Sequence, residues 1–386
     1  MALVLAAACA QQPNDTNDGP SDPYSPGLSK YEHVFNHVPA NSQLPDIGKA
    51  DAVYPAQSKE LLDTQSPVKD QDRRGVCTIF TTTALMEHLY IKAGMQNPSF
   101  SEQYLQWAVK VQLGVLPNSE GSNVSNNVDA IHQFGIVESS VDPYNGKEWT
   151  AANDADCAPD GTETQQLPAK CWTQGDPTDA MKAAKKYTLP AGKFINTKDI
   201  KAHITSDKTA VGLGIDFFYQ AWNHGASTLP IDREEMRKGV VRYPNATDIT
   251  ESHKERAGHG ILIVGWDDNM EVQNVGADGK PVLGTDGKPT TQKGFYIFKN
   301  SWGTEVFGIE NDLPKGYGYI SQKYVEQYGT AYVTGMPSLD SQPEGPPPPA
   351  QCDFNCSDYG FSANQCEQGV RCDAQGQCLT ADPTCE

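Results

Sequence analysis

The chain is poor in basic residues and in long apolar stretches, and both shortages restrict its function. Its 386 residues include 30 Lys and Arg against 49 Asp and Glu, a net charge of −19. This charge argues against nucleic acid or an anionic lipid surface as the main partner. After the first nine residues, no run is apolar enough to span a membrane. The sequence also lacks a paired Cys-x-x-Cys motif or a Cys/His cluster, so we expect no metal and no cofactor.

The ten cysteines are unevenly distributed along the chain. Six of them crowd into the last 35 residues, at positions 352, 356, 366, 372, 378 and 385. A piece this short cannot bury a core without covalent links, so we expect three disulfides whose pairing the sequence leaves open. Cys157 and Cys171 can close a fourth loop, which leaves Cys77 as a free thiol. The number of cysteines expected to form disulfides indicates an oxidising compartment outside the cytosol.

Cys9 ends a short apolar run, Leu5-Ala6-Ala7-Ala8-Cys9, that precedes a polar stretch. The run resembles a bacterial lipoprotein cleavage site, although Ala6 stands three places before the cysteine and no basic segment comes first. An ordinary export signal cut near Ala8 is the alternative. Either way we expect an exported protein, secreted or an outer-surface lipoprotein with Cys9 as the candidate lipid anchor.

One glutamine, one cysteine, one histidine and one asparagine follow each other in the order of a thiol acyl-transfer site: Gln71, Cys77, His259 and Asn300. A thiol attacks as thiolate, so it needs a base and an electropositive environment. The residues after Cys77 predict a helix, whose N-terminus favours negative charge. His259 would move the proton, Asn300 would orient the imidazole, and the Gln71 amide would donate to a developing oxyanion.

The residues around these four resemble the papain family of cysteine peptidases. The spacing from Gln71 to Cys77 is that of the family, as are the runs Ser66–Gln71, Lys299–Gly303 and Gly316–Ile320. The resemblance spans roughly residues 50–335. It implies an α+β fold of two lobes, a helical N-terminal lobe and a β-rich C-terminal lobe. It also implies an endopeptidase that hydrolyses proteins or peptides through an acyl-enzyme on Cys77.

The same resemblance assigns the residues that bind the substrate. Gly121 and Ser122 match a glycine pair whose backbone pairs with an extended peptide. Val211 and Ala257 are expected to wall an apolar pocket for the residue two before the scissile bond. Gly258 precedes the histidine, and Trp302 matches an indole that shields the Asn–His hydrogen bond from water.

Three residues depart from the family pattern near the predicted nucleophile. Thr78 stands where a tryptophan is usual. Arg74 and Ser119 occupy the positions of a cysteine pair that forms a disulfide in the family. Because both cysteines are replaced together, we expect another interaction to stabilise this region in place of the disulfide.

The composition divides the chain into five parts. We expect a signal or lipoprotein-like segment at 1–9, a disordered tether or short pro-segment at 10–45, and the peptidase domain at 46–336. A proline-rich linker at 337–351 and a cysteine-rich module at 352–386 follow. The stretch between Cys9 and Tyr54 is too short for the long inhibitory pro-domain of many family members, so no full-length zymogen is expected.

Local patterns predict the main elements of the domain. A helix is expected over 78–93, ended by Gly94, and a second one through Gln112 after a capping box in Ser99–Glu102. Apolar runs predict buried strands at 211–215, 261–266, 295–299 and 317–321. Two insertions interrupt the pattern, at 145–175 and 267–294. The second contains a near-repeat with two Asp-Gly turns, which favours hairpins.

Two other functions remain open from the sequence. The same Cys–His pair could serve an amidase or a transpeptidase. Alternatively, the papain-like body could be a non-catalytic scaffold on which the cysteine-rich module binds a surface glycan or protein. In each case we expect a monomer.

Overall fold

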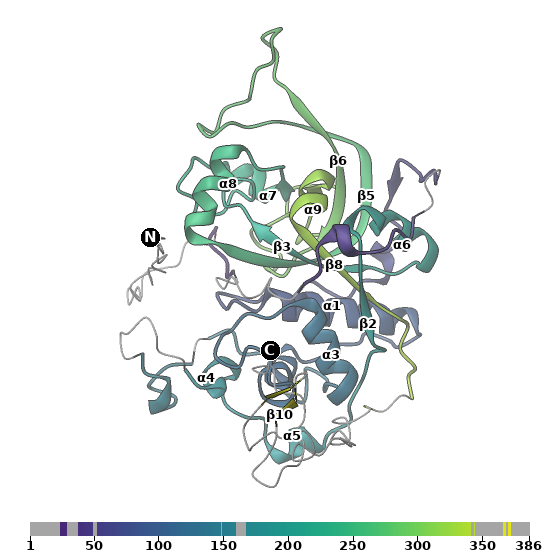
Figure 1. The fold of residues 1–386 in the computed structure, drawn as a ribbon, viewed down its shortest axis with the longest axis vertical. Coiled ribbons are helices and arrows are strands. Elements are labelled where there is room, and N and C mark those ends of the chain that lie inside the picture. The colour runs from purple at the N-terminus through teal and green to yellow at the C-terminus, as the bar shows by residue number, and fades with distance from the viewer. Residues whose placement is uncertain are drawn as a thin grey trace.

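The computed structural model describes residues 24–28, 38–48, 52–147, 149–159, 167–340 and 343, and the backbone of the short strands β9 (Cys366–Glu367) and β10 (Val370–Arg371). The main body has the papain-like α+β architecture, with helices in one lobe and a large sheet in the other (Figure 1). None of the described helices is long and apolar enough to cross a membrane. Cys9 and the side chains of the cysteine-rich module lie outside the described residues.

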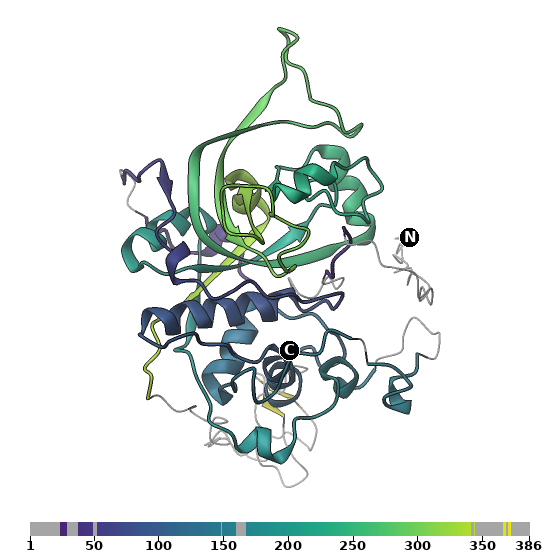
Figure 2. The same cartoon turned by 180° about the vertical axis from the view of Figure 1, so that it is seen from behind.

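The helical lobe is organised around α1 (Cys77–Lys92), which lies along the boundary between the lobes (Figure 2). This element confirms the helix predicted after Cys77. Thirteen of its 16 residues are buried, because it packs between the sheet and the other helices. It ends before Gly94, whose φ of +99° is a left-handed conformation that favours glycine. The remaining helices of this lobe are α2 (Glu102–Trp107), α3 (Val124–Phe134), α4 (Ala169–Thr173) and α5 (Asp179–Ala183).

The capping box predicted in Ser99–Glu102 is wrong. The N-cap of α2 is Ser101, whose hydroxyl accepts from the Tyr104 N–H at 2.8 Å. Glu102 is therefore the first helical residue, and its carboxylate pairs with Lys69 instead of the helix start. Helical conformation does continue through Gln112, but as one π-helical stretch over Ala108–Gln112.

The second lobe is built on one eight-stranded sheet in the order β2-β8-β3-β5-β6-β7-β4, with β1 paired to the far part of β5. The four predicted strands are confirmed as β3 (Val211–Phe217), β5 (Ala257–Gln273), β6 (Thr291–Lys299) and β7 (Tyr317–Ser321). All pairs are antiparallel except β4 with β7. The other strands are β1 (Gln57–Ser58), β2 (Gly192–Ile195), β4 (Val240–Val241) and β8 (Gly329–Thr334).

Four further helices surround this sheet: α6 (Ile200–Asp207), α7 (Arg233–Arg237), α8 (Ala246–Ser252) and α9 (Gln322–Tyr328). Among the described residues, short 3-10 turns lie at Asn41–Gln43, Leu62–Thr64, Ala155–Cys157, Thr197–Asp199 and His253–Glu255.

The first predicted insertion packs against the helical lobe and contains α4, whereas the second extends away from the sheet (Figure 1). Cys157 and Cys171 form a disulfide with a Cα–Cα distance of 5.5 Å, as expected for the first insertion. The second extends the β5–β6 pair into a narrow arm of hairpins, seen at the top of Figure 1. Asp278 and Asp286 each accept the N–H of the lysine two residues later at 3.1 Å, so each carboxylate stabilises the turn in which it lies.

The two lobes meet where the start of α1 crosses β5. A Cβ atom on Gly260 would lie 2.8 Å from the Thr78 Cα, a distance that real Cβ atoms do not reach. The glycine after His259 therefore lets the strand pass directly over the first turn of the helix. This close approach brings residues of β5 next to the predicted nucleophile at the start of α1.

Candidate active site

Cys77 is the first residue of α1, completely buried and outside any disulfide. Its Sγ lies 4.0 Å from the carbonyl oxygen of Gly258, the residue before His259. The N-cap residue, Val76, provides no side-chain acceptor for the N–H groups of the first turn. The positive end of the helix dipole therefore acts on the sulfur and favours its thiolate form.

His259 and Asn300 are joined by a hydrogen bond of 2.8 Å between Nε2 and Oδ1. The same Oδ1 also accepts the Ser301 N–H at 2.9 Å. Because an amide oxygen can only accept, the imidazole hydrogen resides on Nε2 and the lone pair on Nδ1. Nδ1 is buried and makes no hydrogen bond to the described residues. Burial lowers the pKa of His259 to about 3, so the ring is neutral at pH 7 and Nδ1 can accept a proton.

Trp302 covers this pair. Its ring lies nearly parallel to the His259 imidazole, with centroids 4.6 Å apart and an interplanar angle of 29°. Trp222 contacts the same imidazole edge-on at 5.2 Å. Both indoles are buried, so they keep water away from the His259–Asn300 hydrogen bond.

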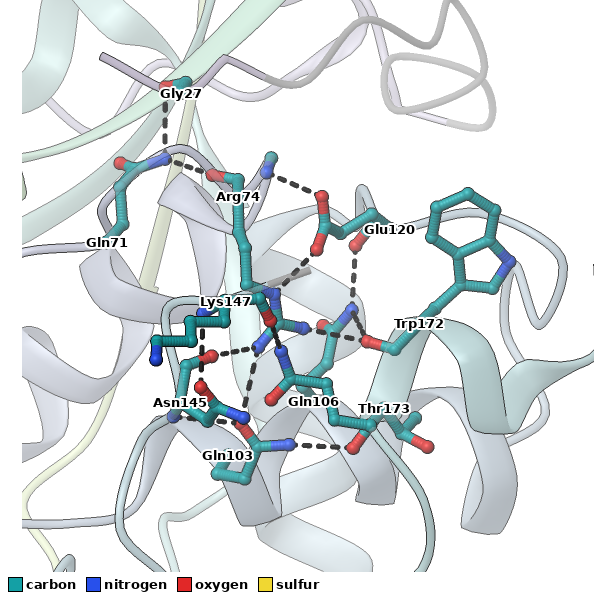
Figure 3. A network of polar contacts seen from close by, with 12 residues as sticks. Gly27, Gln71, Arg74, Gln103, Gln106, Glu120, Asn145, Lys147, Trp172 and Thr173 are labelled. Carbon is teal, nitrogen blue, oxygen red and sulfur yellow. Dashed lines mark hydrogen bonds and ion pairs between the residues drawn. The ribbon is translucent and has the colours of Figure 1, made fainter. Parts of the chain in front are cut away.

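Gln71 lies on the loop before α1, fully buried, with its amide held on both sides. Its Oε1 accepts from the Ser301 hydroxyl at 2.7 Å. Its Nε2 donates to the carbonyl oxygens of Arg74 at 2.7 Å and Gly27 at 3.0 Å (Figure 3). The Ser301 contact links this loop to the segment after β6, and so fixes Gln71 relative to Asn300.

An ion pair between the buried Arg74 and the partly buried Glu120 stands where the family resemblance placed a disulfide. Arg74 Nε donates to Glu120 Oε1 at 2.7 Å, and the other oxygen of Glu120 accepts the Gly75 N–H at 2.7 Å (Figure 3). The remaining guanidinium N–H groups reach Gln103 Oε1 and the carbonyls of Asn145 and Trp172. Glu120, not Ser119, is thus the partner of Arg74, and the pair ties the loop between Gln71 and Cys77 to the helical lobe.

A cluster of buried charges lies behind Asn300, and sequence reasoning missed it. Lys299 Nζ donates to the Ser66 carbonyl and hydroxyl at 2.7 and 2.8 Å. The Ser66 hydroxyl reaches Glu87, whose other oxygen pairs with Lys69 at 2.7 Å. Burial lowers the pKa of Lys299 to about 8. The available signal was Glu87, a charged residue in the middle of a helix that was predicted to be buried.

A small cavity, partly open to solvent, lies beside His259. Most of its lining comes from α1, α3 and the sheet: Thr78, Asn123, Val124, Ser125, Phe194, Gly214, His259, Thr330 and Tyr332, with Val38 from the N-terminal region. Val211 and Ala257, the predicted walls of the substrate pocket, are not among these lining residues. Val211 is buried in the core of the sheet, and Gly214, three residues further along β3, reaches the cavity from the opposite face.

Gly121 and Ser122 are buried beside this cavity. The Gly121 carbonyl accepts from Lys110 Nζ, and the Ser122 carbonyl accepts from the Thr78 hydroxyl at 3.0 Å. Thr78, which replaces the usual tryptophan, therefore connects the residue after Cys77 to the predicted substrate-binding segment. Within the described part of the chain, no group of three His, Cys, Asp or Glu side chains could hold a metal ion.

Comparisons with known proteins found several similar chains. A cathepsin L-like proteinase of Fasciola hepatica is 22% identical over 335 residues, which cover 82% of this chain and 79% of the relative. Among solved structures, the cysteine protease xylellain of Xylella fastidiosa is 17% identical with a TM-score of 0.47, covering 81% of this chain and 97% of its own. Digestive procathepsin L2 of Tenebrio molitor is 19% identical with a TM-score of 0.48, covering 81% and 78%.

The family model for papain family cysteine proteases matches residues 59–333, which is most of the chain and includes all four residues of the predicted site. The chain belongs to the papain family of cysteine proteases and is a cysteine-type peptidase.

Proposed function

We propose that the chain is a thiol endopeptidase whose nucleophile is Cys77. His259 Nδ1 takes the thiol proton, the sulfur bonds to the scissile carbonyl carbon, and the imidazolium then protonates the leaving amine as the C–N bond breaks. Water attacks the resulting thioester with His259 as base, which releases the acid and restores the thiol. The Gln71 amide and the Cys77 backbone N–H donate to the oxyanion in both steps.

The observation that carries this proposal is the His259–Asn300 hydrogen bond. It sets the proton on Nε2 and leaves the Nδ1 lone pair without a partner among the described residues, beside the helix terminus that bears Cys77. An unpartnered buried ring nitrogen is costly, and active sites are where such groups are retained.

The cavity beside His259 supports a preference for an apolar side chain in the substrate residue two before the scissile bond. Val124, Phe194 and Tyr332 line it with apolar atoms. A Cβ atom on Gly214 would meet nothing within 4 Å, so this side of the cavity is open. We therefore expect large aliphatic or aromatic residues to be accepted there.

We also propose export, with protein or peptide substrates outside the cytosol. The Cys157–Cys171 disulfide is consistent with an oxidising compartment. Cys9 is the candidate lipid anchor, and the cysteine-rich module at 352–386 is the candidate binding module for a surface glycan or protein.

The test compares the parent protein with Cys77→Ser on a denatured protein substrate, with fragments identified by mass spectrometry. We expect cuts inside the substrate, with an apolar residue two positions before each cut, and no cuts with Cys77→Ser. An added amine should not become joined to the fragments. Equal cleavage by Cys77→Ser, or products joined mainly to the amine, would contradict an endopeptidase on Cys77.

A further inference from the structure

The segment Glu120–Ser122 has three consecutive carbonyl groups, and each of them accepts a hydrogen bond from a different side chain. The first accepts from Gln106 Nε2 at 2.9 Å (Figure 3). The second accepts from Lys110 Nζ, and the third from the Thr78 hydroxyl at 3.0 Å. The segment lies outside the helices and strands, so these side chains supply the hydrogen bonds that regular structure would otherwise give its backbone.

Lys110 is an unusual donor because its ammonium group is buried. Burial lowers the pKa of Lys110 to about 7, and the nearby Glu120 carboxylate acts in the opposite direction. The two oxygens of that carboxylate accept from Arg74 and from the Gly75 N–H. A buried charge is costly unless hydrogen bonds compensate for it. The bond to the Gly121 carbonyl therefore indicates what the buried ammonium does in this fold.

Lys110 lies in the π-helical stretch Ala108–Gln112, where the Leu113 N–H donates to the Ala108 carbonyl at 2.8 Å. Turns of this kind are rare and are frequently found at functional sites. Gln106 lies four residues earlier, in α2. Successive turns of one helical element thus supply the donors for two successive carbonyls of the segment.

The segment connects several parts of the candidate active site. Thr78, which holds its last carbonyl, is the residue after Cys77. Asn123, the residue that follows the segment, lines the cavity beside His259. A change in the position of the segment would therefore move the backbone predicted to pair with a peptide relative to both the nucleophile and the cavity.

We propose that Lys110 and Gln106 are positioning residues for the substrate: they fix the backbone of Gly121 and Ser122 in the place where an extended peptide pairs with it. The proposal rests on the proposed function. Neither side chain touches the substrate, and both act through the carbonyls that they hold. Because the segment is already ordered before the peptide arrives, binding does not have to order it, and affinity increases.

The test compares the parent with Lys110→Met, which keeps a long side chain and removes the donor. Cys77 is labelled by iodoacetamide, which is too small to extend to the segment, and by a peptidyl epoxide with two residues before its reactive group. We expect Lys110→Met to raise the KI of the epoxide roughly tenfold, on the scale of one hydrogen bond to a charged group. The maximal rate with the epoxide and the rate with iodoacetamide should not change. Lys288→Met is the matched control, since Lys288 is exposed on the hairpin arm, and it should change none of these values.

Gln106→Met is the second variant, and we expect a smaller rise in KI with the same rate of iodoacetamide labelling. If Lys110→Met does not fold, this variant decides the test. An unchanged KI would overturn the proposal. A similar change in labelling by both reagents would also overturn it, because the two residues would then support the whole site instead of the peptide-pairing segment. The expected rise in KI in a protein whose parent form cleaves no peptide would support the positioning role and contradict the endopeptidase.

Discussion

The indole of Trp302 lies 4.6 Å from the imidazole of His259 and nearly parallel to it. It covers the hydrogen bond through which Asn300 holds the ring. Water would compete for the donor and the acceptor if this hydrogen bond were exposed. Because the bond is covered, the tautomer and the orientation of the ring stay fixed.

Replacing Asn300 should therefore reduce turnover more than substrate binding. With Asn300→Ala, we expect kcat to fall roughly a hundredfold while KM changes little, since the ring loses its orientation as proton carrier. Asn269→Ala is the control, because Asn269 is exposed on the far part of β5. A rise in KM with kcat preserved would show that Asn300 serves substrate binding instead.

The pH dependence of Cys77 alkylation should show the action of His259. The imidazole is neutral at pH 7 and no described residue forms a hydrogen bond with its Nδ1, so it can take the thiol proton, and labelling by a peptidyl epoxide should stay fast well below pH 7. With His259→Ala, labelling should need the pH of an ordinary thiol, whose pKa is about 8.5. Intact mass reports both rates. If the parent and His259→Ala give the same pH profile, the proposed pair does not exist.

The Arg74–Glu120 ion pair should stabilise the loop that carries Gln71. Glu120→Ala leaves the guanidinium buried without a counter-charge, which we expect to lower the free energy of unfolding by about 3 kcal/mol. Removing both partners, with Arg74→Met and Glu120→Ala, should cost less than the sum of the single changes. Urea unfolding of the four proteins gives this coupling. Lys198→Ala, which breaks an exposed pair with Asp46, should change stability little.

Filling the cavity beside His259 should narrow its substrate preference. A side chain on Gly214 meets open space, so Gly214→Ala and Gly214→Val should fold normally. We expect kcat/KM for a substrate with a large apolar residue at the second position before the cut to fall stepwise, by roughly tenfold for the larger change. The kcat/KM for a substrate with a small residue at that position should not change. Gly335→Ala is the control, because Gly335 lies outside the cavity. Equal losses of kcat/KM on both substrates would contradict the assignment of the cavity as a substrate pocket.

His88 should make folding sensitive to mild acid. Its Nε2 accepts the Ala210 N–H at 3.1 Å, and burial lowers its pKa to about 4. A depressed pKa contributes stability that is present above about pH 6.5 and is lost as the pH falls through 4, at most about 3 kcal/mol. Unfolding measured at pH 7 and pH 4 should show a smaller difference for His88→Gln than for the parent. The same difference in both proteins would mean that other groups cause the acid sensitivity.

Local patterns predicted much of the domain. The helix after Cys77, the four central strands and the hairpins of the second insertion depend on periodicity, Asp-Gly turns and Gly94, which act over a few residues. The Cys157–Cys171 disulfide also followed from counting cysteines. The N-cap at Ser101 was not predicted, because the spacing from Ser99 to Glu102 favoured Ser99, whereas it is the Ser101 hydroxyl that accepts the Tyr104 N–H and Glu102 pairs with Lys69.

Parts of the site depend on contacts between distant segments. Which residue of β3 faces the cavity depends on the register of the strand, since a shift of one position reverses the face on which a side chain lies. The Arg74–Glu120 pair and the charges around Lys299 required knowing which buried groups meet.

The sequence by itself determined the residue types of the predicted site, their order and the family to which the chain belongs. Only the tertiary structure decided what surrounds them: the indole over His259, the ion pair under the loop of Gln71, and Gly27 on the Gln71 amide. The physical reason is that each of these contacts joins residues from separate segments of the chain. Their energy depends on burial and distance, which no local pattern encodes.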